Sequence, residues 1–163
     1  MTDYAELEKE LQSLIRGVPH LIADLANASA LLWRALDRIN WVGFYICDGE
    51  TLILGPFQGK PACIEIPFGK GVCGKAAQTG STQLVPDVHR FPGHIACDES
   101  TNSEIVVPIR DGERIVAVLD IDSVIPARFT EEDRAGLEAV ASLMERELTG
   151  LWQTKKCQTA DNG

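Results

Sequence analysis

This chain has few basic residues and no long apolar run. It carries 15 lysine and arginine residues against 24 aspartate and glutamate residues, which gives a formal net charge of −9. Without a basic stripe to displace the counterions of a phosphate backbone, the protein is not expected to bind nucleic acid. No apolar run approaches the roughly 18 residues of a membrane span, and the first residues lack the basic and apolar regions of a signal peptide. We therefore expect a cytoplasmic protein that does not enter a membrane.

Cysteines are few and odd in number. Five cysteines in 163 residues are poor evidence for a structural disulfide framework in a reducing compartment, and they fit metal binding, catalysis or no chemical role better. A buried, inert side chain is the commonest fate of a free cysteine. The length and the 45% hydrophobic content predict one globular domain over residues 1–152. The polar tail at 153–163 is expected to be flexible, so its Cys157 is expected to have no role.

The hydrophobic period changes along the chain. Apolar residues recur at helical spacing in residues 3–16 and 20–37, and from residue 40 onward the period becomes two. The Asp-Gly pairs at 48–49 and 111–112 predict hairpin turns, and residues 55–61 are expected to break a strand. The pattern predicts an α+β fold in which an antiparallel sheet of about six short strands lies between helices. The expected strands cover residues 40–47, 51–54, 62–66, 82–85, 104–109 and 114–122, and two further helices cover 72–78 and 131–148.

Two of the expected strands present side chains suited to a ligand site. Trp41 and Tyr45 share one face of their strand with Gly43, and a glycine between two aromatic rings leaves a notch where another group can approach. Ordinary packing is the other explanation for these rings. Strict alternation through residues 114–122 places Asp120 and Asp122 together on one face of the last strand. A polar sheet face is the alternative explanation for the two aspartates.

The strongest chemical signal lies in the long connection at 86–102. Residues 93–98 (Gly-His-Ile-Ala-Cys-Asp) place Cys97 in a loop flanked by glycine and proline, and Glu104 follows seven residues later. Loops held by a rigid scaffold are where chemistry is most often located, and a loop of this length is typically functional. Cys63 and Cys73 also lie in or beside glycine-rich loops. Loop thiols with a nearby acid indicate a thiol-based redox enzyme.

The chain resembles the GAF domain family over nearly all of residues 1–150. The residues that carry the resemblance are 40–45 (Asn-Trp-Val-Gly-Phe-Tyr), 71–74 (Gly-Val-Cys-Gly), 103–109 and 118–123. Residues 55–63 (Gly-Pro-Phe-Gln-Gly-Lys-Pro-Ala-Cys), taken together with 93–98, resemble the free methionine-(R)-sulfoxide reductases, which are stand-alone GAF proteins. That resemblance implies reduction of free methionine sulfoxide, with an attacking thiol at Cys97, a resolving thiol at Cys63 and a further redox thiol at Cys73. Related proteins also suggest a homodimer, for which the leading helices could supply the interface.

Reduction of a sulfoxide by a thiol requires few other chemical groups. A thiolate attacks the sulfoxide sulfur while an acid protonates the oxygen, which gives methionine and a cysteine sulfenic acid. A second thiol then converts the sulfenic acid to a disulfide, and thioredoxin or a similar dithiol reductant completes the cycle by exchange. No metal or organic cofactor is required.

The resemblance also implies a substrate-binding acidic group at Glu104, Asp120 and Asp122, with Trp41 and Tyr45 enclosing the methyl end. Desolvation and like-charge repulsion would raise the pKa of Glu104, so that it could donate a proton to the sulfoxide oxygen. The two aspartates suit the ammonium group of the substrate.

Three alternatives stay open. Cys73 is predicted in the first turn of a helix, where the helix dipole lowers a thiol pKa, and this argument alone favours Cys73 over Cys97 as the nucleophile. A non-catalytic GAF sensor that binds a small ligand is a second possibility. A redox switch or zinc protein built on the same thiols is a third, although His94 three residues before Cys97 is weak evidence for a metal.

Overall fold

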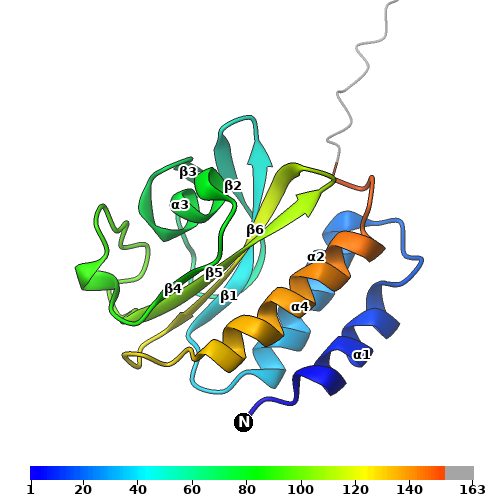
Figure 1. Cartoon of the computed structure of the whole chain (residues 1–163), viewed down its shortest axis with the longest axis horizontal. Coiled ribbons are helices and arrows are strands. Elements are labelled where there is room, and N and C mark those ends of the chain that lie inside the picture. The colour runs from blue at the N-terminus through cyan, green and yellow to red at the C-terminus, as the bar shows by residue number, and fades with distance from the viewer. Residues whose placement is uncertain (153–163) are drawn as a thin grey trace, which may run out of the picture.

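An antiparallel sheet lies between layers of helices in residues 1–152, the part of the chain that the computed structural model describes. Its six strands have the order β3-β2-β1-β6-β5-β4 (Figure 1). The expected tail at 153–163, with Cys157, lies outside the described residues. The strands are β1 (Trp41–Asp48), β2 (Thr51–Gly59), β3 (Glu65–Pro67), β4 (Gln83–Val85), β5 (Ser103–Asp111) and β6 (Arg114–Ser123). The helices are α1 (Tyr4–Ile15), α2 (Leu21–Ala35), α3 (Gly71–Thr79), the 3-10 helix η1 (Val88–Arg90) and α4 (Glu131–Glu147).

The two faces of the sheet carry two separate apolar clusters. Helices α1, α2 and α4 lie over one face, and α3 with the long loops lies over the other (Figure 1). Alternation along β1 sends Val42 and Phe44 into the cluster beneath α1, α2 and α4, and sends Trp41 and Tyr45 to the face beneath α3. The predicted α+β arrangement, with the sheet between helices, is confirmed.

Local signals fix the ends of the helices. Thr130 caps α4 because its hydroxyl accepts from the Asp133 backbone N–H at 3.2 Å, while the Asp133 carboxylate accepts from the Thr130 backbone N–H at 2.9 Å. Helix α3 ends at Gly80, whose left-handed conformation (φ +66°) suits a residue without a Cβ. No helix among residues 1–152 is long and apolar enough to cross a membrane.

Strand β2 is longer than the sequence pattern indicated. The expected break at residues 55–61 is wrong, because pairing with β1 continues to Gly59. Leu54 pairs with Tyr45 and Phe57 pairs with Gly43, so Gly55 and Pro56 form a bulge within the strand. A proline lacks a backbone N–H, and at a bulge that missing donor interrupts the ladder least.

A second bulge alters the expected alternation in β6. Ala117 pairs with Ile109 but Ile115 pairs with Arg110, so Val116 is an extra residue between them. Val116 therefore packs into the cluster beneath α1, α2 and α4, and Ile115 packs against the opposite one, which reverses the face expected for each. Beyond the bulge the alternation holds, so Asp120 and Asp122 lie on the α3 side of the sheet.

Candidate active site

A cavity lies between the α3 side of the sheet and the two loops that carry Cys63 and Cys97. Seven of the eight residues predicted from the sequence line it, and Cys63 is the exception. Strands β1, β5 and β6 form its floor, and α3 and the loop at 91–102 form its walls. The predicted residues that line it are Trp41, Tyr45, Cys73, Cys97, Glu104, Asp120 and Asp122.

A disulfide bond joins Cys63 to Cys97 at this cavity. The two residues are 34 positions apart in the chain, and their Cα atoms lie 5.6 Å apart. The Tyr45 hydroxyl donates to the Cys63 carbonyl at 3.0 Å, which fixes the Cys63 backbone to strand β1. Two loops that are distant in sequence therefore meet at these sulfur atoms. Cys73 and Cys47 are free thiols, and Cys73 is buried.

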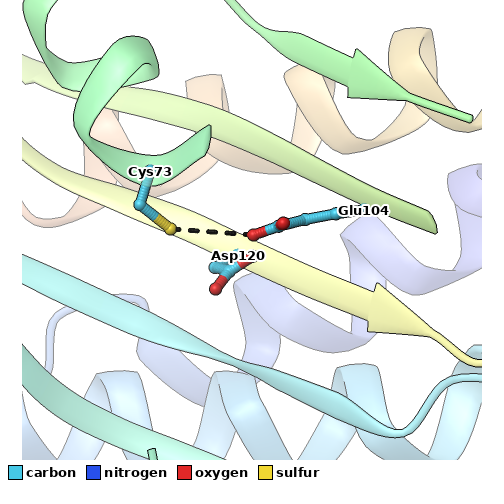
Figure 2. Close-up of side chains that lie close together, drawn as sticks. All are labelled: Cys73, Glu104 and Asp120. Carbon is cyan, nitrogen blue, oxygen red and sulfur yellow. Dashed lines mark hydrogen bonds between the residues drawn. The ribbon is translucent and has the colours of Figure 1, made fainter. Parts of the chain in front are cut away.

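Three carboxylates and the Cys73 thiol form the inner end of the cavity. Glu104 on β5 pairs in register with Asp122 on β6, and Asp120 lies two residues before Asp122 on the same face. Glu104 and Asp120 are only 7% and 6% exposed. The Cys73 thiol donates to Glu104 Oε1 at 3.9 Å, and Figure 2 shows the Asp120 carboxylate beside this pair.

The carboxylates lack partners for part of their hydrogen-bonding capacity. Asp120 Oδ1 and Asp122 Oδ1 are both buried, and neither accepts a hydrogen bond from the protein. A buried oxygen without a donor is unfavourable until a cation or donor reaches it. Because both residues line the cavity, these two atoms are suited to a cationic or hydrogen-donating group of a ligand.

Burial keeps these three carboxyl groups protonated at pH values above their ordinary pKa. It raises the pKa of Glu104 well above the usual value, and the neighbouring charges of Asp120 and Asp122 raise it further. Burial, followed by the charge of Asp120, also raises the pKa of Asp122, and burial raises that of Asp120. A protonated carboxyl group inside an enclosed cavity can donate a proton to a bound oxygen atom.

The same buried acids counteract the effect of the helix terminus on the pKa of the Cys73 thiol. Cys73 does lie in the first turn of α3, as predicted. Burial, together with the neighbouring charges of Asp120 and Glu104, nevertheless raises the pKa of its thiol well above the ordinary value. A thiol that stays protonated is a poor nucleophile. The expected lowering by the helix terminus is therefore wrong for this residue.

Close aromatic packing, and not an open notch, explains why residue 43 is a glycine. The Trp41 ring stacks on Phe57 with ring centroids 5.2 Å apart, and it also stacks on Tyr45 at 5.9 Å. A Cβ atom placed on Gly43 would lie 2.3 Å from the Cβ of Phe57. The space beside Gly43 is thus filled by Phe57 and Trp41, and the ligand notch expected there is absent. Trp41 and Tyr45 still line the cavity with their other surfaces.

A polar link that the sequence pattern does not predict holds the loop of Cys97. The Asn40 side-chain amide donates to Asp98 Oδ2 and to Thr101 Oγ1, each at 3.1 Å. These bonds join the residue after Cys97 to the start of β1, and the Asn40 backbone N–H donates to the Asp122 carbonyl at 2.9 Å. No periodicity signals a contact across 58 residues, so only the three-dimensional structure identifies it.

Within residues 1–152, one set of ligand atoms could hold a metal ion. The Cys73 sulfur and one oxygen each of Glu104 and Asp120 lie within 4.8 Å of one another (Figure 2). A thiolate with two carboxylates is a donor set that zinc accepts, although structural zinc sites have four ligands. His94, the other candidate, lines the cavity but is not part of this group.

A family model, a curated relative and solved structures all match this chain over most of its length. A family model for the GAF domain matches residues 10–148. The free methionine-R-sulfoxide reductase of Escherichia coli K12 is 50% identical over 145 residues, which cover 89% of this chain and 88% of that protein. The structure of fRMsr of Staphylococcus aureus in complex with substrate has a TM-score of 0.87 at 53% identity, covering 91% of this chain and 97% of that one. The free methionine-R-sulfoxide reductase from Neisseria meningitidis in complex with its substrate has a TM-score of 0.86 at 42% identity, covering 89% of this chain and 87% of that one.

Proposed function

This chain belongs to the GAF domain family and, within it, to the free methionine-R-sulfoxide reductases, and from this premise we propose that Cys97 carries out the reduction with Cys63 as its resolving thiol. The observation that supports these roles most directly is the disulfide between the two residues beside a cavity with buried acids. We assign the reaction to a single catalytic domain, residues 1–152.

The reaction proceeds in two halves. The Cys97 thiolate attacks the sulfur of methionine sulfoxide, and Glu104 protonates the departing oxygen, which yields methionine and a sulfenic acid on Cys97. The Cys63 thiol then attacks the sulfenic sulfur and releases water, leaving the disulfide. The substrate gains two electrons and the two cysteines lose them, so the balance closes without a metal or an organic cofactor. The raised pKa of Glu104 supports its part as the acid.

Asp120 and Asp122 receive the ammonium group of the substrate. Each has a buried Oδ1 without a donor, and an ammonium brings both a positive charge and N–H donors. Trp41 and Tyr45 cover the apolar part of the substrate. Cys73 donates to Glu104 and thus holds the acid in place. Its further role as a second resolving or relay thiol remains a prediction.

A comparison of free and blocked substrates tests this arrangement. We expect turnover of the free R epimer with dithiothreitol, and almost no turnover of N-acetylated, C-amidated methionine sulfoxide or of oxidised protein. A blocked substrate leaves the buried carboxylates without their cation, which costs on the order of several kcal/mol and corresponds to a thousandfold or more in kcat/KM. Comparable kcat/KM values for the free and the blocked substrate would contradict the enclosed site. Preference for the S epimer would contradict the reaction assigned.

The sensor and switch alternatives predict different outcomes in the same preparation. A non-catalytic GAF sensor would bind a small ligand without releasing methionine. A zinc protein would retain stoichiometric zinc on Cys73, Glu104 and Asp120 after purification, which elemental analysis measures. Methionine release without bound zinc would favour the reductase over both.

We also propose that thioredoxin or a similar dithiol protein reduces the disulfide, that the protein is a homodimer, and that it works in the cytoplasm. Helices α1 and α2 present partly exposed apolar side chains, Leu14 at 41% and Trp33 at 40%, which supports their use as the dimer interface. Light scattering across a range of concentrations tests the dimer, and a Trp33→Asp variant should shift it to the monomer. A monomeric wild-type protein would contradict the proposal.

A further inference from the structure

The surface around the disulfide has an apolar residue whose exposure is fixed by the backbone. Ile64, next to Cys63 in the chain, is 71% exposed, more than any other large apolar side chain within residues 2–152. Its carbonyl accepts from the Leu54 backbone N–H at 2.9 Å, and the Tyr45 hydroxyl donates to the neighbouring Cys63 carbonyl. Both carbonyls of this dipeptide are thus bound to the sheet. Ile64 is held outward by the fold and is not part of a freely moving loop.

A second exposed apolar side chain lies near the other cysteine. Ile95, two residues before Cys97, is 37% exposed and lies over Gly71 at the start of α3. Each half of the Cys63–Cys97 disulfide thus has an exposed apolar residue within two positions of it in the chain. A protein that reduces this bond must bring a thiolate to one of its sulfur atoms, so it must also contact the residues around the bond.

The two cysteines differ in their surroundings. Cys97 lines the cavity and Cys63 does not, although both residues are partly exposed. Asp98, directly after Cys97, accepts hydrogen bonds from the Ser100 backbone N–H and hydroxyl, which hold it in the ionised form. A thiolate that approaches Cys97 meets the negative charge of this carboxylate, which Lys60 partly offsets. The neighbours of Cys63 in the chain are Ala62 and Ile64, which carry no charge.

We propose that Ile64 and its surroundings form the docking surface for a dithiol oxidoreductase, and that the incoming thiolate attacks Cys63. This inference rests on the function proposed above. The partner sulfur bonds to Cys63 Sγ, the Cys63–Cys97 bond breaks, and Cys97 leaves as the thiolate that the next turnover needs. The second thiol of the partner then attacks the mixed disulfide and releases Cys63. The partner loses two electrons and this protein gains them. Redox encounters of this kind have small interfaces, so one central apolar residue carries a large share of the contact.

Matched variants test the docking surface with thioredoxin as the probe. Ile64→Asn should raise the KM for thioredoxin about tenfold or more, as the loss of a central contact does. Turnover driven by dithiothreitol should be unchanged, because this small thiol needs no docking surface. Ile22→Asn is the control, since Ile22 on α2 is 62% exposed and lies away from the disulfide. An equal thioredoxin KM in the two variants would overturn the proposal.

A trapping experiment tests which sulfur is attacked and uses the wild-type form of this protein. The oxidised protein is mixed with a thioredoxin whose second active-site cysteine is serine, the reaction is quenched with acid, and free thiols are alkylated. Mass spectrometry of peptides should find the partner on Cys63 and the alkyl label on Cys97. The reverse distribution would overturn the proposal. A wild-type protein without dithiothreitol-driven turnover would refute the proposed reaction. Turnover with dithiothreitol but not thioredoxin would refute the docking inference and the choice of thioredoxin as reductant, and would leave the reaction itself in place.

Discussion

Neutralising Glu104 should make the protein more stable and less active. The carboxyl is 7% exposed and faces Asp120 and Asp122, and burial is the main reason that its pKa is raised. Glu104→Gln retains the side-chain oxygen that accepts from the Cys73 thiol but cannot ionise. The variant therefore removes the cost of keeping a carboxylate in this cavity without removing its hydrogen bond.

The sign of the pH dependence follows from the direction of the shift. In the unfolded chain Glu104 ionises near its ordinary pKa of about 4.3, whereas the folded protein still binds the proton at higher pH. The folded state then binds more protons than the unfolded one, so stability falls as pH rises from the unfolded pKa to the folded pKa. Each unit by which a pKa is raised corresponds to about 1.4 kcal/mol, so the advantage of Glu104→Gln should increase with pH.

The expected size is on the order of 1–3 kcal/mol near neutral pH, the usual cost of burying a polar group without full compensation. For a domain of about 150 residues, each kcal/mol shifts Tm by roughly 2–4 °C. Thermal unfolding of wild type and Glu104→Gln at about pH 5 and about pH 8 measures this difference, with dithiothreitol activity assayed on the same samples. Glu138→Gln on the exposed surface of α4 is the matched control.

Comparing variant with wild type also removes the contribution of His94. Burial lowers the pKa of His94, so this residue adds stability as pH rises through its titration, opposite to the acids. Both proteins contain His94, so its contribution cancels, and the difference between them reports Glu104 together with its coupling to Asp120 and Asp122. If Glu104→Gln were no more stable than Glu138→Gln at the higher pH, the buried-acid explanation would be refuted. Unimpaired single-turnover rates in Glu104→Gln would refute its part as the proton donor.

Three further predictions concern the two disulfide cysteines, the aspartates Asp120 and Asp122, and Gly43. Cys97→Ser should abolish turnover even with excess dithiothreitol, while Cys63→Ser should keep substantial turnover with dithiothreitol and lose it with thioredoxin; an active Cys97→Ser enzyme would reverse the assignment. Binding of methionine sulfoxide to Cys97→Ser should release protons from Asp120 and Asp122, because an ammonium favours their ionised forms; calorimetry in buffers of different ionisation enthalpy measures this, and a buffer-independent enthalpy would contradict it. Gly43→Ala should destabilise the protein by about 1–3 kcal/mol in urea unfolding, because its Cβ would overlap Phe57, and an unchanged midpoint would show that the strand relaxes freely.

The sequence predicted the fold wherever a local signal existed. The hairpin turns expected at the two Asp-Gly pairs depend on short-range chemistry, and both are confirmed in the structure. The Thr130 cap and the glycine that follows α3 are local features of the same kind. The errors lie at two bulges and at the third strand, which was expected from residue 62 and begins at Glu65. Gly55-Pro56 fits a strand break and a bulge equally well, and nothing in the residues around Val116 reveals that β6 carries an extra residue relative to β5, because a bulge is a property of the pairing.

The candidate site could be predicted only in part, for a comparable reason. Alternation in β6 placed Asp120 and Asp122 on one face, and the resemblance nominated Cys63 and Cys97 together. The link from Asn40 to the loop of Cys97 could not be predicted, since it depends on how two distant segments meet.

The environment of each cysteine, more than its position along a helix or loop, determines what it can do. Cys73 occupies the first turn of a helix, a position that by itself favours a reactive thiolate. It is also buried against Asp120 and Glu104, and these surroundings raise the pKa of its thiol. Removing the nearby negative charge should therefore bring the Cys73 thiol pKa down. In an Asp120→Asn variant we expect alkylation of Cys73 in the oxidised protein, where Cys63 and Cys97 are bonded, to begin at lower pH than in wild type. An unchanged alkylation profile would mean that burial alone protects this thiol.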